Sequence, residues 1–149
     1  MKRLFFGLSC LLVLVSLQGC GESVVDFSDL QRRGDVYIWS KNQKPYSGKF
    51  INYYRNGSVH QTGSMRNGRL HGELVTNREN GKTNKIETFR EGVLNGKYSD
   101  YWFNSGRISW TGNFRNGKKH GEWKLHNNSD GGKVEIIQNY KDGELVTNH

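Results

Sequence analysis

Two kinds of hydrophobic pattern divide the chain. Residues 4–17 form an almost unbroken apolar run behind the positive pair Lys2 and Arg3. A helix of about fourteen residues spans about 21 Å, which is too short for a hydrocarbon core about 30 Å thick. The run is therefore typical of the hydrophobic region of a helical signal peptide, which we assign to residues 1–19.

From about residue 36 onward, short alternating segments are separated by regularly spaced glycines. Each copy of the pattern has a start glycine (48, 72, 96, 121), a middle glycine (57, 81, 106, 132) and a late glycine (68, 92, 117, 143). The middle glycine always precedes the late one by 11 residues, and the late glycine precedes the next start by 4. Spacings that stay constant over four copies indicate an internal repeat. The copies lie near residues 48–71, 72–95, 96–120 and 121–146.

Each copy predicts one β-hairpin. Asn-Gly between two alternating segments is typical of a two-residue type I′ turn, in which both central residues have positive φ. With Asn56-Gly57 as such a turn, the third residue of a copy faces a defined position on the second strand. In two copies this position is a glycine that a ring can cover, and in the other two it is not. The predicted pairs are Phe50–Gly63 and Tyr98–Gly112, against Leu74–Glu87 and Trp123–Gln138.

The hairpins predict an all-β fold, a meander of about four hairpins. Side chains alternate between the two faces of a sheet, so aromatic residues at matching positions of successive copies form stripes on one face. Stripes of this kind are typical of a core. The same face is also the candidate binding face, formed by Tyr54, Tyr98, Trp102, Trp110 and Trp123.

Composition is consistent with a sheet protein. The 149-residue chain is 34% hydrophobic and 12% aromatic, with 19 glycines and one proline. Disordered segments usually lack aromatic residues, and a protein that crosses a membrane several times needs repeated long apolar runs. The formal net charge is +8. Such a surface suits anionic lipid head groups, glycan phosphates or an acidic protein, or it serves solubility alone. Export argues against a nucleic-acid partner.

The sequence gives little sign of catalysis. It contains no nucleophile elbow, Walker loop or zincin motif. His71 and His120 occupy the same repeat position, which makes them repeat markers rather than metal ligands. We expect Glu87 and Asp100 to be isolated on the sheet, a poor arrangement for hydrolysis by paired carboxylates. We therefore predict no catalytic residue, no metal site and no cofactor.

The end of the apolar run resembles the lipobox of bacterial lipoproteins, with Leu17, Gln18 and Gly19 before Cys20. The resemblance implies that the Cys20 thiol receives a diacylglycerol thioether, and that Cys20 becomes the first residue after cleavage. Two acyl chains then give stable anchoring. An ordinary signal peptide with an incidental cysteine is the alternative. Because Gly21 rather than Asp follows the cysteine, the resemblance favours the outer membrane if the cell is Gram-negative.

This reading divides the chain into three parts. Residues 1–19 are the signal peptide, and residues 20–35 are a lipidated tether with little fixed structure. Residues 36–149 are the repeat domain, with a short strand beginning at Val36.

The repeat itself resembles the MORN repeat in a variant form. Its pattern is Gly-x-aromatic-x-x-Tyr-aromatic, then Asn-Gly, then aromatic-x-Asn-Gly-x-x-x-Gly. The segments 45–50 and 116–123 are similar to bacterial proteins of the YwqK-type antitoxin family. The resemblance covers about residues 36–146 and implies an elongated, curved meander associated with membrane attachment or protein assembly. The second copy departs from it, with Asn77 and Arg78 at positions that are aromatic in the first and third copies.

Three functions follow as hypotheses. We expect a non-catalytic, lipid-anchored cell-envelope protein whose repeats mediate interaction with a protein or a membrane surface. Its partners are then the membrane, through acyl chains on Cys20, and an unidentified protein. The alternative is an antitoxin or immunity protein against an envelope-acting toxin. An enzyme acting on cell-wall glycan is the third hypothesis, and it requires two carboxylates facing a cleft.

Overall fold

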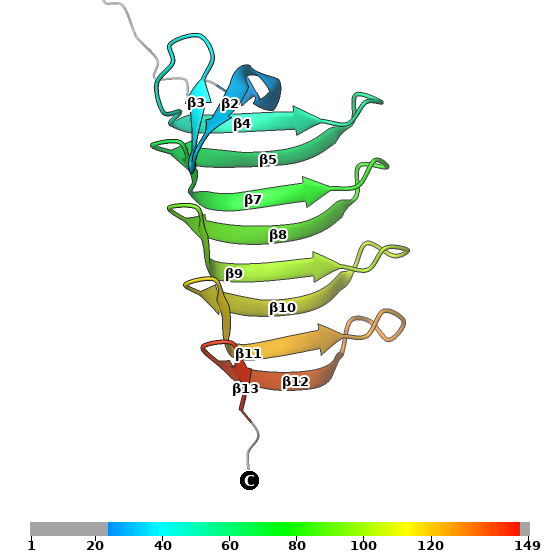
Figure 1. Ribbon diagram of the computed structural model, residues 1–149. Helices are drawn as coiled ribbons and strands as arrows, with labels where there is room; N and C mark the ends of the chain where they lie inside the picture. Colours follow the sequence, from blue (N-terminus) through cyan, green and yellow to red (C-terminus); the bar gives the residue numbers. More distant parts are fainter. Residues whose placement is uncertain (1–23, 147–149) are drawn as a thin grey trace, which may run out of the picture.

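The computed structural model describes residues 24–146, which form an all-β protein (Figure 1). Its main sheet has eleven strands in the order β1-β4-β5-β7-β8-β9-β10-β11-β12-β13, with β6 paired to β5. Four successive antiparallel hairpins make up most of this sheet. They are β4 (Gly48–Tyr53) with β5 (Val59–Arg66), β7 (Gly72–Asn77) with β8 (Thr83–Arg90), β9 (Val93–Tyr101) with β10 (Ile108–Arg115), and β11 (Lys118–His126) with β12 (Val134–Lys141). Two short strands, β6 (Arg69–Leu70) and β13 (Glu144–Leu145), complete the path.

The late turns between hairpins are the two-residue turns in which both residues have positive φ. Asn67, Glu91, Asn116 and Asp142 have φ between 49° and 51°, and the glycine that follows each of them has φ between 76° and 97°. These values are those of a type I′ turn, whose twist matches that of the flanking strands. The turn type predicted for the middle of each copy is therefore found at its late glycine.

The middle turns are wider than predicted. In the first copy, the Tyr54 amide donates to the Ser58 carbonyl (2.9 Å), so three residues rather than two close the turn. Asn56 does not have positive φ. It is suited to the turn because its side-chain oxygen accepts a hydrogen bond from the Ser58 amide (2.9 Å).

A β-bulge beside each middle turn restores the predicted register. The shift falls between Asn52 and Tyr53 in the first copy, and an equivalent shift follows the middle turn of every other copy. As a result, all four predicted cross-strand pairs are confirmed: Phe50–Gly63, Leu74–Glu87, Tyr98–Gly112 and Trp123–Gln138.

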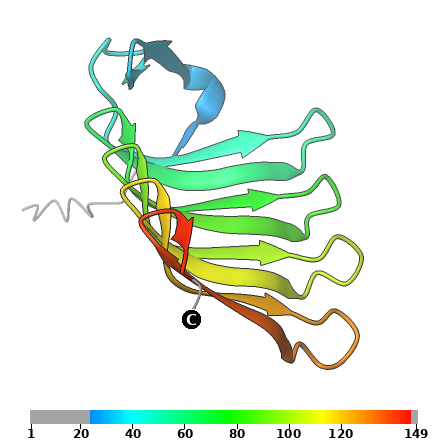
Figure 2. The same cartoon turned by 60° about the horizontal axis from the view of Figure 1, so that its bottom comes forward.

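The segment before the repeats is structured, so the prediction of an unstructured tether is wrong for its described part. Strand β1 (Val24–Asp26) pairs in parallel with β4, and a 3₁₀ turn η1 (Phe27–Asp29) leads into β2 (Leu30–Arg33). Strand β2 pairs with β3 (Val36–Trp39), the strand that the sequence predicts at Val36. Apolar residues within this segment drive the packing, which the sequence pattern alone did not reveal. Figure 2 shows the segment folded back at one end of the curved main sheet.

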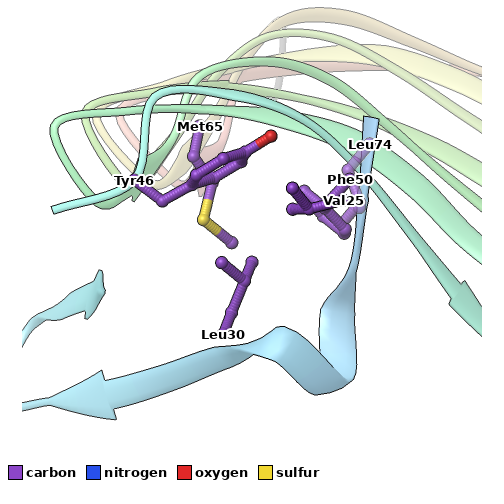
Figure 3. Close-up of a cluster of buried hydrophobic side chains, with 6 residues drawn as sticks. All are labelled: Val25, Leu30, Tyr46, Phe50, Met65 and Leu74. Atoms are coloured by element: carbon purple, nitrogen blue, oxygen red, sulfur yellow. The ribbon is translucent and has the colours of Figure 1, made fainter. Parts of the chain in front are cut away.

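The described core lies under this N-terminal segment. Val25 and Leu30 from the segment pack with Tyr46 and with residues of the first two hairpins, and Figure 3 shows Leu30 pointing toward Met65 and Tyr46. The hairpin residues of the cluster are Phe50, Met65 and Leu74.

Gly68, at the first late turn, allows the segment to dock. Its φ is +76°, and a Cβ built there would lie 2.6 Å from the Tyr37 carbonyl oxygen. The Gly68 amide donates to the Tyr46 carbonyl (2.7 Å), and its own carbonyl accepts from the Tyr37 amide (2.8 Å). Only glycine combines this φ with this close approach. Within residues 24–146, no helix is long and apolar enough to cross a membrane.

Candidate functional site

One face of the main sheet carries the predicted aromatic stripes, and we call it the aromatic face. Its members come from the third residue of each copy and from the residue three before each late glycine. They are Phe50, Leu74, Tyr98 and Trp123, and Met65, Phe89, Phe114 and Tyr140. The N-terminal segment covers the first part of this face, here called the covered half. The open half comprises Tyr98, Phe114, Trp123 and Tyr140, and no segment of residues 24–146 covers it in this way.

The rings of the open half contact one another. Trp123 lies at the centre, with ring-centroid distances of 5.2 Å to Phe114, 5.3 Å to Tyr98 and 6.2 Å to Tyr140. Most of these pairs are edge-to-face, a favourable arrangement for aromatic quadrupoles. The rings therefore hold each other in place without a covering layer.

Trp123 forms the floor of the open half. Its side chain is only 2% exposed, and its indole Nε1 donates to the Asn113 carbonyl (3.1 Å). A Cβ built on Gly112 would lie 2.3 Å from the indole, so the ring rests directly on the glycine backbone. The sequence predicts that the ring of Tyr98 covers Gly112, but the ring that lies on this glycine is that of Trp123, from the neighbouring strand. Tyr98 is the cross-strand partner of Gly112, as predicted.

A pocket of about 300 Å³ opens above this floor. Three residues of the candidate binding face line this pocket, together with Phe114 and two charged residues. The lining residues are Glu87, Tyr98, Trp110, Phe114, Lys119 and Trp123.

The ammonium group of Lys119 lies over the ring faces. Its Nζ is 4.3 Å from the ring centroid of Trp123, 4.8 Å from that of Tyr140 and 5.8 Å from that of Trp110. Ring faces are electronegative and attract a cation at these distances. A positive charge is thus held against the rings that line the pocket.

Glu87 provides the negative charge of the pocket. The residue is only 8% exposed, and its Oε2 pairs with the Lys85 ammonium at 3.0 Å. Burial, together with the negative charges of Asp100 and Glu87, raises the pKa of Tyr98 to about 12. The Tyr98 hydroxyl is therefore a neutral hydrogen-bond donor at physiological pH.

Glu87 and Asp100, which we expected to be isolated on the sheet, both lie near the Tyr98 hydroxyl. Glu87 is the cross-strand partner of Tyr98, Asp100 lies two residues further along β9, and both act on the Tyr98 hydroxyl. Asp100 does not line the pocket, and its Oδ1 accepts a hydrogen bond from the Tyr101 amide (2.8 Å). Among the described residues the pocket itself therefore offers a single carboxylate.

Two members of the predicted binding face have a structural role instead. The Tyr54 hydroxyl donates to the Asn77 carbonyl (2.8 Å), and the Trp102 indole donates to the His126 carbonyl (3.0 Å). Each bond joins one hairpin to the next. Neither ring lines the pocket above Trp123, so the structure does not bring these two residues together with the other three.

Arg78 fills the same repeat position in the second copy and makes the same kind of link. Its Nη1 donates to the Trp102 carbonyl (3.4 Å), and its Nη2 bonds the Tyr101 carbonyl. The substitution that marks the second copy as divergent therefore preserves a link between hairpins. In each of the first three copies the residue at this position has a side-chain hydrogen-bond donor. This shared property is the feature of the sequence that could have identified the links between hairpins.

The two repeat-position histidines lie beside acids of the next late turn. His71 Nδ1 is 3.3 Å from Glu91, and His120 Nδ1 is 3.4 Å from Asp142. Each acid also pairs with an arginine, Arg66 or Arg115 respectively. No group of three His, Cys, Asp or Glu residues that could hold a metal ion occurs within residues 24–146.

Another hollow, of about 460 Å³, lies beside β1 and is lined largely by small and aliphatic residues such as Val24, Ile51 and Val75. Lys49 and Glu73 also line it, but Phe50 is its only aromatic residue in the described part of the chain, in contrast to the four rings of the pocket above Trp123. The predicted lipidation residue Cys20 and the lipobox residues Leu17, Gln18 and Gly19 lie outside the described residues.

Comparison of the chain with models of protein families, with curated proteins and with solved structures gave no match. The functional argument therefore depends on the geometry of the aromatic face.

Proposed function

We propose that this protein is a non-catalytic, lipid-anchored protein of the cell envelope that binds another protein through the open half of its aromatic face. The observation that carries the proposal is the pocket of Tyr98, Trp110, Phe114 and Trp123, which is open on a face that the same chain buries at its other end. Clustered aromatic rings with one or two charged groups are the usual centre of a protein interface.

The surrounding sheet supports a binding role because it holds the rings in fixed positions. Links from Tyr54, Arg78 and Trp102 join consecutive hairpins on one side. On the other side, the Gly92 amide donates to the Leu70 carbonyl and the Gly117 amide donates to the Leu94 carbonyl, both at 2.8 Å. A preorganised surface loses little entropy when it binds a partner.

The location follows from the first twenty residues and remains part of the proposal. The apolar run and the lipobox-like sequence before Cys20 favour export and acylation. The MORN-like repeat, with one hairpin per copy, agrees with an assembly role near a membrane. Labelled palmitate should enter the parent protein and not Cys20→Ser. Equal labelling of both would contradict the anchor.

Site-directed photo-crosslinking in intact cells tests the binding role. A photo-reactive benzophenone amino acid replaces Trp110 at the pocket, and in a matched control it replaces Tyr53, which is exposed and belongs to the opposite face. We expect a discrete protein adduct from position 110 and none from position 53.

The adduct also distinguishes the alternatives. No adduct at position 110, or equal adducts at both positions, would contradict binding through the open half. An adduct containing lipid rather than protein would favour a membrane-surface role instead. A toxin as the adducted protein would support the immunity function within the same binding mode.

A further inference from the structure

Both charged residues of the pocket depart from the repeat. The position of Lys119, two residues after the late glycine, is leucine in the other three copies: Leu70, Leu94 and Leu145. The position of Glu87, opposite the third residue of a copy, is uncharged in the other three copies: Gly63, Gly112 and Gln138. Two independent departures thus meet in one pocket of the open half.

Neither departure improves the packing of the sheet. Leu70 packs against the core of the covered half, whereas Lys119, in the same register opposite Phe114, places a cation among rings. Lys119 is half-buried, and partial withdrawal of its charge from water costs free energy that leucine would not cost. Departures from a local rule without a structural gain are typical of functional positions.

Lys119 retains its hydrogen-bonding capacity. Among residues 24–146, its ammonium contacts only the ring faces of Trp110, Trp123 and Tyr140. An ammonium group has three N–H donors, and ring faces satisfy them weakly. The pocket therefore presents a cation that is positioned and lacks an anionic partner in the described part of the chain.

Glu87 offers the complementary acceptor. Its Oε2 is engaged by Lys85, and no donor among the described residues reaches its Oε1. A ligand that suits both groups carries an anion for Lys119 and an N–H donor for Glu87. It also needs an apolar part that can lie on the rings of Tyr98 and Trp110.

We propose that the pocket binds an aspartate or glutamate side chain from an extended acidic segment of the partner protein. This inference rests on the proposed function and specifies the partner's chemistry. The carboxylate pairs with Lys119 above the aromatic floor, a neighbouring backbone amide donates to Glu87 Oε1, and an adjacent apolar side chain lies on the rings. After removal of residues 1–19, with Lys2 and Arg3, the chain would keep a formal net charge of +6, which favours approach of an acidic segment.

The repeat supplies variants that should fold. Lys119→Leu introduces the residue of the other three copies, and Glu87→Gln introduces the residue of the fourth copy. Lys97→Leu is the control, because it removes one positive charge from the residue next to Tyr98, on the opposite face of β9.

An array of extended peptides tests the inference. Each peptide holds one Asp or Glu between apolar residues and is printed beside its Asn or Gln isostere and its Lys counterpart. We expect the folded repeat protein to prefer acidic peptides to their isosteres by about tenfold, as one favourable ion pair implies. The preference should disappear in Lys119→Leu, persist in Lys97→Leu and reverse toward Lys peptides in Lys119→Glu.

Three results would overturn the inference. The first is equal binding of acidic peptides and isosteres, and the second is a preference that survives Lys119→Leu. The third is binding to vesicles of anionic lipid, but not to peptides, that is lost in Lys119→Leu, because it would assign the pocket to a membrane. If Lys119→Leu keeps the photo-crosslink at position 110, the proposed binding function stands and the acidic partner does not. If no crosslink forms at position 110 when Lys119 is intact, both the proposed binding function and the acidic partner are contradicted.

Discussion

The covered and open halves of the aromatic face are built from the same repeat and end in opposite states. In the covered half, Phe50 and Met65 are buried beneath Val25 and Leu30 of the N-terminal segment. In the open half, the equivalent residues Tyr98 and Phe114 are only partly buried and line a pocket. The repeat fixes where the rings stand, and the segment outside the repeat decides which of them are covered, although Trp123 is as buried in the open half as Phe50 is in the covered half.

The difference also appears in the choice of side chains. Members of the covered half are apolar at every position that faces the segment, and the aliphatic residues there need no polar partner. Members of the open half carry polar atoms or stand beside charges, as Tyr98, Trp123 and Lys119 do. Rings with a polar edge suit a surface that is exposed to water in the free protein and covered when a partner is bound. Four predictions test this contrast.

The largest effect on stability is expected from removing the aromatic ring at the third residue of the first copy, Phe50, in the covered half. Phe50 is 2% exposed, so Phe50→Ala should lower the free energy of unfolding by about 3–5 kcal/mol. Tyr98→Ala, at the same repeat position in the open half, should cost roughly half as much, because part of the ring is already in water. Urea unfolding with an unchanged slope measures both values. Equal losses would show that the open half is as much a core as the covered half.

The next effect concerns the two glycines beneath rings. Gly112→Ala would bring a Cβ within 2.3 Å of the Trp123 indole, and the expected cost is about 1–3 kcal/mol. In Gly63→Ala the nearest atoms are 3.0 Å away, in the Phe50 ring, and a cost of about 1 kcal/mol or less is expected.

For the glycines the larger loss is expected in the open half, whereas for ring removal it is expected in the covered half. The reason is that Trp123 lies closer to Gly112 than Phe50 lies to Gly63. Tryptophan fluorescence should shift in Gly112→Ala and not in Gly63→Ala. A larger loss in Gly63→Ala would contradict the assignment of Trp123 as the floor.

The third prediction compares two tyrosines at high pH. Burial raises the pKa of Tyr46 in the covered half, whereas burial and the charges of Asp100 and Glu87 raise the pKa of Tyr98 to about 12. The unfolded chain releases the proton near pH 10, so Tyr98 contributes stability below about pH 10 that is lost as the pH rises toward 12. Glu87→Gln should lower the pKa of Tyr98 and leave that of Tyr46 unchanged.

Ultraviolet difference titration follows the ionisation, and Tyr98→Phe identifies the Tyr98 component. An equal change at both tyrosines in Glu87→Gln would mean that the carboxylate acts through the whole fold rather than within the pocket.

The repeat arithmetic predicts the fold well because strand register is set by constant spacings. The four cross-strand pairs are correct even though the middle turn is not the type I′ turn expected. A bulge beside each middle turn compensates for the extra turn residue, and such compensation leaves no mark in the spacing. The turn itself differs because the Asn56 side chain accepts the Ser58 amide instead of adopting positive φ.

The site is predicted only in part. Tyr98, Trp110 and Trp123 do converge, because alternation and register place them on one face. Tyr54 and Trp102 do not line the pocket with them, because they lie at the middle turns, where each bonds a carbonyl of the next hairpin. The fold of residues 24–33 was missed because this segment shares no pattern with the repeat and is ordered by the core it covers.

The smallest effect is expected at the late turns, where the two halves should behave alike. Glu91 pairs with Arg66 at the start of the sheet, and Asp142 pairs with Arg115 at its end. Hydrogen bonds from these arginines lower the pKa of both exposed acids. A lowered folded pKa means that each pair contributes stability above the unfolded pKa and loses it as the pH falls through the folded value.

Glu91→Asn and Asp142→Asn should remove this acid dependence while relieving the turn, because Asn tolerates positive φ and already occupies the other two late turns. The two terms oppose each other, so the urea midpoint should change little at neutral pH. In acid and at high salt the parent loses its ion pair while the relief of the turn remains, so both variants should become more stable than the parent there. The change should be the same for both variants, since each acid pairs with one arginine and lies beside one histidine. A substantially larger loss in Asp142→Asn would mean that the open half depends on its ion pairs for stability, and that its missing cover is replaced by charge at the edges rather than by the stacked rings around Trp123.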